Sequence, residues 1–282
     1  MKISIIIPTY NEEDVILDCL ESLSNQSYKD FEVMVVDDGS KVNSKLKAQN
    51  SKLKFRIKNL KVLAQAHKGP GAARNLGAKH AKGEILVFVD ADMTFDVKFL
   101  QELTKPILEG KTKGTFSKNE FVSNWRNRWA RCWNINEGWE SGRRHPKGYP
   151  DKQKVFRAIL KNEFDKVGGF DPSRGYTDDW TLSERLGYEA EIASGAKFFH
   201  KNPEKLAEVF KHAHWVGKRP YKLGYLGYIL AVFRSSLPVS LVVGILNGVL
   251  NNMLEFIIFK VVYDFGVFCG ILDYILTGRA MK

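Results

Sequence analysis

Cysteine is scarce in this chain of 282 residues, which has Cys19, Cys132 and Cys269. Their odd number and wide separation exclude a disulfide framework and the close cysteine pairs of a zinc site. Free cysteines are typical of proteins in a reducing compartment. The fold must therefore rest on apolar burial, and hydrophobic residues make up 44% of the chain, enough to fill a core.

Several nucleotide-binding and catalytic motifs are also missing. The chain contains no GxxxxGK[ST] phosphate loop, no helical HExxH and no GxSxG. GPGAAR at 69–74 superficially matches a dinucleotide-binding fingerprint, but Arg74 stands where Gly or Ala belongs and the segment does not follow the first strand. P-loop and dinucleotide-binding domains are therefore disfavoured. The apolar run 3–7 is too short for a signal peptide and predicts a strand.

Acidic residues are absent from residues 39–83, which hold twelve Lys or Arg, and the whole chain has a net charge of +11. A solvated basic face is the ordinary explanation of such a run. The net charge favours anionic partners, namely phosphates, acidic lipid headgroups or nucleic acid. No nucleic-acid-binding module is recognisable, so we expect no nucleic-acid partner.

Strands and helices are expected to alternate in the first ninety residues. Predicted strands occupy the runs KISIII, FEVMVV and EILVFV. One predicted helix follows Asn11, which is a candidate N-cap. The basic segment after residue 40 is a second predicted helix, and GPGAARNLGAKHAKG is a predicted turn and helix. This order predicts an α/β fold with a parallel sheet covered on both faces. In such sheets ligands bind at the carboxyl ends of the strands.

Polar sequences follow three of these strands: PTYNE, VVDDGS and VDADM. In the last of them, Asp90 and Asp92 are two residues apart and project to the same side of an extended chain. An isolated pair would be explained as ordinary turn residues. The convergence of three polar strand ends instead favours a site for a hard divalent cation, Mn²⁺ or Mg²⁺, with a phosphate ligand.

The ordered set of motifs IIIPTYNE (5–12), VVDDGS (35–40), GAARNLG (71–77), VDADM (89–93), VGGFD (167–171) and DDWTLSERLG (178–187) resembles the family-2 glycosyltransferases. The resemblance covers roughly residues 1–220. It implies a GT-A fold, Rossmann-like and mostly parallel, and inverting transfer of a sugar from a nucleotide-diphospho-sugar such as a UDP- or GDP-sugar.

The resemblance also implies roles for individual residues. Those expected to hold the donor are Pro8, Tyr10 and Glu12 at the nucleoside, Asp38 (rather than Asp37) at the base, Arg74 near the donor, and Asp90 at the ribose or sugar. Asp92 is expected to ligate the metal that bridges the diphosphate. Asp179 is expected to be the catalytic base, while Asp178 caps the helix that follows. His200 is a candidate metal or diphosphate contact, although a structural histidine is equally consistent with the sequence.

A motif common in relatives, Q/RxxRW, is replaced here by KHAHW at 211–215. Processive synthases typically keep that motif, so its absence favours transfer of a single sugar. Trp125, Trp129 and Trp133 are spaced four apart in a basic segment and would form one stripe on a helix. That stripe is a core face, an acceptor wall that stacks on sugars, or an interfacial surface.

Composition becomes strongly apolar after residue 220, so we expect a helical membrane-association region at 221–282. The run 237–250 is short for a membrane span. The run 253–276 is long enough but includes Glu255, Lys260, Asp264 and Asp273, of which Lys260 and Asp264 could pair at i,i+4. Interfacial helices or a hairpin are favoured. A helical appendage used for core packing or homo-oligomer formation is the alternative.

These observations together predict a metal-dependent inverting glycosyltransferase. It would act at the cytoplasmic face of the membrane on a hydroxyl of a glycan or lipid-linked acceptor. A nucleotidyltransferase is disfavoured because PTYNEED lacks the Gly-rich loop and Lys of that class. The alternative from another class is a catalytically inactive sugar-nucleotide-binding or membrane scaffold protein.

Overall fold

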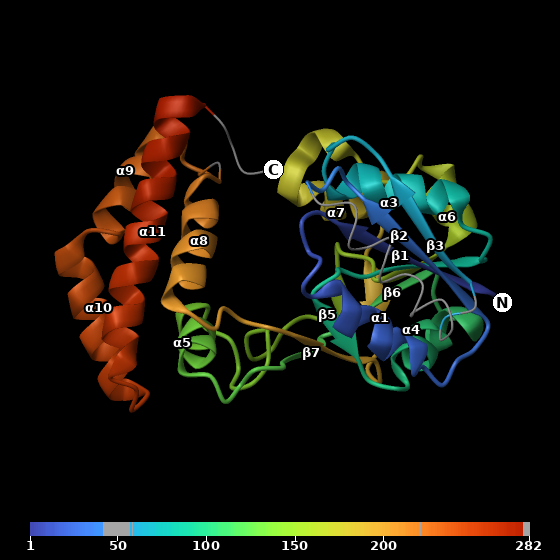
Figure 1. The fold of residues 1–282 in the computed structure, drawn as a ribbon, viewed down its shortest axis with the longest axis horizontal. Helices are drawn as coiled ribbons and strands as arrows, with labels where there is room; N and C mark the ends of the chain where they lie inside the picture. Colours follow the sequence, from blue (N-terminus) through green and yellow to red (C-terminus); the bar gives the residue numbers. More distant parts are fainter. Residues whose placement is uncertain (42–56, 58, 220, 279–282) are drawn as a thin grey trace. The chain divides into compact units, whose positions relative to one another are not determined.

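The computed structural model describes residues 1–41, 57, 59–219 and 221–278, without the side chains of 175–177 (Figure 1). The helix expected in the basic segment after residue 40 lies outside the described residues. The chain divides into two compact units: a sheet unit of residues 1–121 and 148–200, and a helical unit of residues 122–147 and 201–282. These limits differ from the expected boundary at residue 220, whose functional meaning stays a prediction.

The sheet unit is built on an eight-stranded sheet of order β3-β2-β1-β4-β9-β6-β10-β8. Its strands are β1 (Ile3–Thr9), β2 (Phe31–Asp37), β3 (Leu60–Ala64), β4 (Ile85–Phe88), β6 (Gly114–Phe116), β8 (Lys152–Gln153), β9 (Ala158–Leu160) and β10 (Ala190–Ile192). The first four strands run parallel, whereas β9 is antiparallel to both β4 and β6. The expected mostly parallel α/β sheet is therefore confirmed.

Helices cover both faces of this sheet (Figure 1). They are α1 (Ile16–Ser24), α3 (Pro70–His80), α4 (Phe99–Leu108), α6 (Lys161–Lys166) and α7 (Asp178–Leu186), the last preceded by the 3₁₀ helix η1 (Pro172–Thr177). On β1, Ile5 and Ile7 pack with side chains of α1 and α4, while Ile6 packs with those of α3, α6 and α7. This alternation follows from the two-residue period of a strand.

A second sheet of three strands lies in order β5 (Met93–Phe95), β11 (Lys197–His200) and β7 (Asn119–Val122). β5 and β11 are antiparallel, and His200 lies opposite Met93. Because β11 lies between β5 and β7, His200 has neighbours from the segments of both strands.

The helix expected to start after Asn11 begins only at Ile16, so the prediction that Asn11 caps it is wrong. Asn11 has a positive φ of 55°, a conformation that Asn tolerates better than most residues. Its N–H donates to Ser40 Oγ (2.8 Å) and its side-chain oxygen accepts the Lys41 N–H (3.0 Å). Asn11 therefore ties the loop after β1 to the loop after β2 instead of starting a helix.

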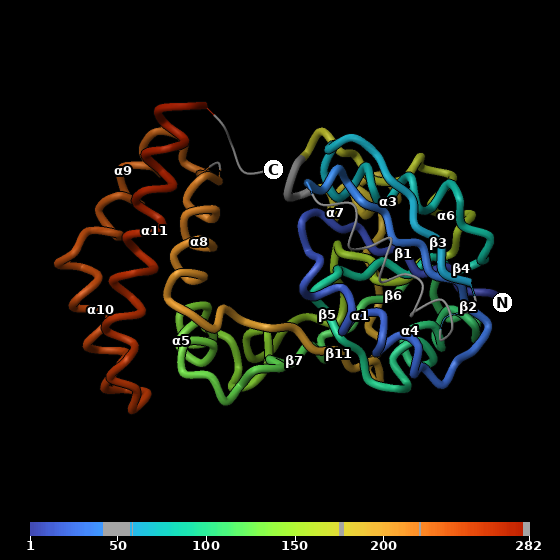
Figure 2. Tube along the Cα trace, viewed as in Figure 1, coloured from blue at the N-terminus to red at the C-terminus, as the bar shows by residue number. Residues whose placement is uncertain are grey.

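The helical unit contains α5 (Arg128–Asn136), α8 (Leu206–Gly217), α9 (Gly224–Arg234), α10 (Leu237–Leu250) and α11 (Glu255–Thr277). In this unit α11 lies between α8 on one side and α9 and α10 on the other (Figure 2). Glycines permit the close contact with α8, because a Cβ at Gly266 would lie 2.8 Å from both Ala213 Cβ and the Phe210 carbonyl oxygen. Larger residues at this seam would force the helices apart.

Two tryptophans of the expected stripe pack in the interior of the helical unit. Trp125 precedes α5, while Trp133 is buried and Trp129 partly buried against Phe256 and Phe259 of α11. The i,i+4 pair of Lys260 and Asp264 is present at 2.9 Å.

Within the described residues, no single helix is both long and apolar enough to cross a membrane. Together, α9 and α10 satisfy those criteria as a pair bent by 63°.

Candidate active site

The loops after β1 and β2 join at the carboxyl edge of the sheet. The Asp38 N–H donates to the Thr9 carbonyl (2.9 Å), and the Ser40 N–H donates to Asp37 Oδ1 (2.9 Å). Gly39 has a φ of 82°, and a Cβ there would lie 2.8 Å from the His67 nitrogen. Glycine is therefore required at this position of VVDDGS both by backbone conformation and by space.

Asp38, the expected base contact, is buried and holds the loop that precedes α3. Its Oδ1 accepts from Gln65 Nε2 (2.7 Å) and the Lys68 N–H (2.9 Å), and its Oδ2 accepts from the Gly69 N–H (2.8 Å). His67 Nδ1 lies 2.8 Å from Oδ2 as well. Both carboxylate oxygens are thus engaged within the chain, and a direct contact with a base stays a prediction.

Tyr10 and His67 form an aromatic stack beside Asp38, with ring centroids 4.1 Å apart and an interplanar angle of 23°. Tyr10 is exposed, so its ring is available to a planar ligand. Pro8, by contrast, is buried within β1 and pairs with Val36. Of Pro8 and Tyr10, two of the three expected nucleoside contacts, the structure leaves only the Tyr10 ring accessible.

Arg74 is the centre of an ion-pair network that joins two distant parts of the sequence. Its guanidinium donates to Asp179 Oδ1 (2.5 Å), Asp178 Oδ1 (3.4 Å) and Asp90 Oδ1 (2.9 Å). Burial alone would lower the pKa of Arg74, but the three carboxylates outweigh it and raise the pKa. Arg74 therefore stays charged and fixes the end of β4 against the start of α7.

Asp90 has a second cationic partner, because Arg157 Nη1 lies 3.2 Å from its Oδ2. Arg157 comes directly before β9, the antiparallel neighbour of β4. Burial opposes ionisation of Asp90, but Arg157 and Arg74 hold its pKa well below the usual range. Asp90 is therefore a fixed anion that orients both guanidinium groups.

The two carboxylates at the start of α7 differ sharply in exposure, 3% for the Asp178 side chain and 33% for that of Asp179. Burial raises the pKa of Asp178 to about 6, and the neighbouring Asp179 adds to this shift against the effect of Arg74. Asp178 also packs on Gly71, where a Cβ would lie 2.5 Å from its Oδ2. Asp178 is thus a buried structural acid, and Asp179 is the more accessible of the two.

Asp92 and His200, the expected metal ligands, lie together. Asp92 Oδ2 is 2.7 Å from His200 Nε2, and Glu120 Oε1 is 2.9 Å from His200 Nδ1. Both ring nitrogens of His200 thus face a carboxylate, and the contact with Glu120 fixes the orientation of the ring. The Asp92 carboxylate suits Mn²⁺ or Mg²⁺ when substrate phosphates supply further ligands, and an imidazole ligand beside it favours Mn²⁺ over Mg²⁺. Across the described residues, no group of three or more His, Cys, Asp and Glu is arranged as a metal site.

The pKa of Glu12 is affected by the negative charge of this site. Burial, followed by repulsion from Asp92 and Asp90, raises the pKa of Glu12 to about 7. Its Oε2 accepts a long hydrogen bond from the Tyr10 N–H (3.4 Å). A cation held beside Asp92 would relieve this repulsion, so the charge distribution also fits a divalent ion.

The structure thus brings Glu12, Arg74, Asp90, Asp92, Asp179 and His200 into one charged constellation, with Tyr10 and Asp38 in the adjoining loops. Sequence reasoning missed Arg157, Glu120 and His67. Arg157 and Glu120 lie on strand segments without a recognisable motif. His67 lies just before GPGAAR in a segment whose only signal was its positive charge.

A mostly parallel sheet with charged residues at its strand ends is an α/β fold that solved structures share. S. aureus TarS 1–349 in complex with UDP-GlcNAc has a TM-score of 0.56 at 21% identity, over 77% of this chain and 66% of that one. TarS 1–349 in complex with UDP has a TM-score of 0.56 at 19% identity, over 100% and 93%. The expected GT-A fold is confirmed.

Residues 4–171 match the model of glycosyl transferase family 2, and the chain therefore belongs to this family. The poly(ribitol-phosphate) beta-glucosyltransferase of Bacillus spizizenii is 42% identical over 125 residues, 40% of this chain and 19% of that protein. Glycosyltransferase GlyA of Streptococcus pneumoniae is 35% identical over 109 residues, 38% of this chain and 15% of that protein. The matched region thus spans less than a fifth of these two relatives.

The raised pKa of Glu12 predicts a pH-dependent stability in metal-free protein. The folded chain keeps this proton up to about pH 7, whereas the unfolded chain releases it near the ordinary value of 4.5. The folded state therefore binds more protons in this window, and its stability falls as the pH rises from 4.5 to 7. Glu12→Gln stays neutral, so between about pH 5 and about pH 8 its advantage over wild type should grow by about 1–2 kcal/mol.

Urea unfolding of both proteins with a chelator present measures this difference, with Glu13→Gln as the matched control. A wild-type and Glu12→Gln difference that does not change with pH, or that shrinks as the pH rises, would show that Glu12 is not held protonated.

Proposed function

We propose that this protein is an inverting, divalent-metal-dependent glycosyltransferase. It transfers a sugar from a nucleotide-diphospho-sugar to a hydroxyl of a glycan or lipid-linked acceptor. The observation that carries the proposal is the joined constellation at the strand ends, where Asp92 and His200 lie 2.7 Å apart and Arg74 links Asp90 to Asp179. Family membership supports the reaction class.

A UDP-sugar is the favoured donor, with a GDP-sugar as the alternative. The favoured choice is supported by the structural likeness to TarS, whose complexes contain UDP-GlcNAc and UDP. In this chain the exposed Tyr10 ring offers a stacking surface for the base. The loop that Asp38 holds lies beside this ring. Arg74 and Arg157 supply positive charge for the leaving diphosphate.

Asp92 and His200 would hold the cation, and Glu120 would orient the His200 ring. A divalent ion bound there supplies positive charge to the leaving diphosphate. The side chains of the protein have the other roles, which are to bind the donor and to accept the proton of the acceptor hydroxyl.

Asp179 is the proposed base. Inversion proceeds by one in-line attack: the acceptor oxygen bonds to the anomeric carbon, the bond to the diphosphate breaks, and the hydroxyl proton passes to a carboxylate. Without donor, Arg74 holds Asp179 and weakens it as a base. A diphosphate that competes for Arg74 would release Asp179, so that the base becomes active only when the donor is bound.

The acceptor and the location are proposed from the names of relatives and from the exposed apolar helices. Two relatives are named poly(ribitol-phosphate) glycosyltransferases, which supports a hydroxyl of a polymer or a lipid-linked chain. The exposed apolar side chains of α9 and α10 support association with the cytoplasmic face of a membrane. A screen of sugar nucleotides for metal-stimulated donor hydrolysis tests the activity. Donor binding without turnover for every donor and acceptor would favour the inactive binding or scaffold protein.

The base assignment predicts a separation of binding from transfer. Asp179→Asn keeps a polar group of the same size but cannot accept the proton. Transfer should fall by about 100- to 10,000-fold. Donor affinity measured by calorimetry should stay at or above that of wild type, because Asp179 no longer competes with the diphosphate for Arg74. Asp165→Asn, an exposed carboxylate on α6, is the matched control and should retain activity. A parallel loss of donor binding in Asp179→Asn would mean that this residue holds the donor instead.

The metal assignment predicts effects on Mn²⁺ binding that need no turnover. In the presence of UDP, an electron paramagnetic resonance titration should show that Asp92→Asn removes most binding. Glu120→Gln should weaken binding by about 10- to 100-fold, because the His200 ring loses its orienting carboxylate. The exposed Glu109→Gln provides the matched control. Asp92→Asn with a wild-type titration curve would refute the site.

A further inference from the structure

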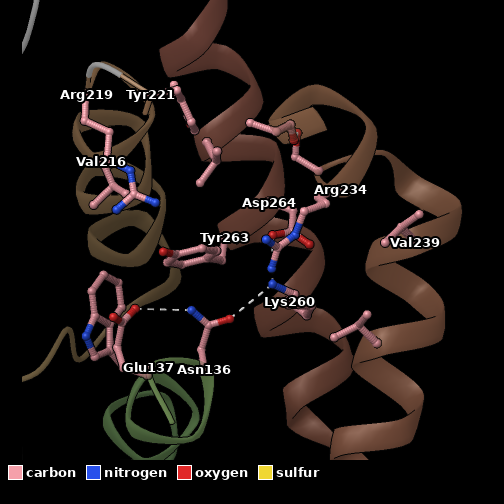
Figure 3. A pocket seen from close by; sticks show the side chains of 15 residues that line it. Asn136, Glu137, Val216, Arg219, Tyr221, Arg234, Val239, Lys260, Tyr263 and Asp264 are labelled. Carbon is pink, nitrogen blue, oxygen red and sulfur yellow. Dashed lines mark hydrogen bonds and ion pairs between the residues drawn. The ribbon is translucent and has the colours of Figure 1, made fainter. Parts of the chain in front are cut away.

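The helical unit encloses a pocket of about 400 Å³ that none of the roles above uses. It is lined by residues of α5, α8, α9, α10 and α11 and of the segment after α8 (Figure 3). Its volume lies in the range of small-molecule sites. Trp133 and Tyr263 form apolar walls, so the pocket combines aromatic surface with charged side chains.

Two of the charges in the pocket neutralise each other. Lys260 Nζ lies 2.9 Å from Asp264 Oδ1 and donates to Asn136 Oδ1 (3.2 Å). The other oxygen of Asp264 accepts from Ser240 Oγ (2.7 Å). Both oxygens of Asp264 are therefore engaged within the helical unit.

Two guanidinium groups remain. Arg219 and Arg234 enter the pocket on either side of Tyr263 (Figure 3). In the part of the chain that the structure describes, neither forms an ion pair with a carboxylate within 4.0 Å. The remaining pocket acid is Glu137, and its single negative charge does not balance two guanidinium groups. The pocket thus has an excess of positive charge, and guanidinium groups match the geometry of phosphate oxygens.

The surface next to these arginines is apolar and exposed. On α9 the exposed residues recur at helical spacing and form one face: Tyr225, Leu226, Ile229, Leu230 and Phe233. α10 presents a similar face: Leu237, Leu241, Val242, Ile245, Leu246, Val249 and Leu250. Leu230 precedes Arg234 by four residues, about one helical turn, so Arg234 lies at the edge of this apolar face. Such faces are typical of helices that lie in a membrane interface.

We propose that this pocket binds the phosphate group of an anionic lipid, with Arg219 and Arg234 as its ligands and the apolar faces of α9 and α10 against the acyl chains. The inference rests on the membrane association in the proposed function and adds the chemical class that is recognised. It concerns the helical unit alone and requires no role for the charged constellation of the sheet unit.

Vesicle co-sedimentation of the full chain tests this inference. Phosphatidylcholine vesicles that contain phosphatidic acid present a phosphate monoester. Vesicles that contain oleate at matched surface charge present a negative surface without one. Wild-type protein should bind the phosphatidic acid vesicles more tightly. Arg219→Gln and Arg234→Gln should each lose that preference, with a more than tenfold weaker affinity for phosphatidic acid vesicles and a smaller loss on oleate vesicles.

Lys211→Gln is the matched control, because Lys211 is an exposed cation on α8 outside the pocket. General attraction to a charged surface predicts about a fivefold loss per cation removed, whichever cation it is. Equal losses in all three variants would therefore overturn the pocket proposal. Arg219 and Arg234 are both exposed, so their substitution should leave the fold intact, and circular dichroism together with Mn²⁺ and UDP binding confirms this.

Soluble phosphate compounds distinguish a lipid phosphate from a free phosphate as the ligand of the pocket. Calorimetry with glycerol 3-phosphate and with inorganic phosphate should show binding far weaker than that to vesicles. Tight binding of either compound, abolished by Arg234→Gln, would mean that the pocket takes a soluble or polymer phosphate, which overturns the lipid assignment. If wild type binds no vesicles, both the pocket proposal and the membrane association fail, while donor turnover still decides the transferase activity.

Discussion

The site depends on one buried guanidinium among three carboxylates. Arg74 is 6% exposed and has contacts with Asp90, Asp178 and Asp179, which come from two segments about ninety residues apart in the chain. A buried charge is tolerated only when paired and hydrogen-bonded. Removing Arg74 would leave Asp178 buried without a cation. The same pairing that stabilises the fold therefore also fixes the position of the proposed base.

The sheet topology explains why these groups meet. β1, β2 and β4 are parallel neighbours, so the polar residues that follow them collect at one edge. β9 runs the other way and brings Arg157 to the end of β4, and the small sheet of β5, β11 and β7 brings Asp92, His200 and Glu120 together. The result is an acidic site held by two arginines, in which a cation and a diphosphate would each find complementary charge.

The alternation of strands and helices in the first ninety residues and the acids after the strands were accessible from sequence, because local hydrophobic patterns and polar strand ends carry that information. The charged residues that pair with His200 and Asp90 were not accessible in this way. Glu120 is 80 residues from His200, and Arg157 is 67 residues from Asp90, and neither lies in a motif. Asn11 was misread as a cap because its role depends on Ser40 in another loop. The apolar composition after residue 220 predicted helices. The pocket with Arg219 and Arg234 could not be predicted, because it depends on how those helices pack.

A double-mutant cycle at Arg74 and Asp178 tests the central claim most directly. The free energy of unfolding should fall by about 3–5 kcal/mol in Arg74→Met, because Asp178 loses its buried cation. Asp178→Asn in the same background should restore much of that loss, since an amide needs no counter-charge. A loss below about 1 kcal/mol in Arg74→Met, or losses from the two substitutions that simply add, would contradict the account.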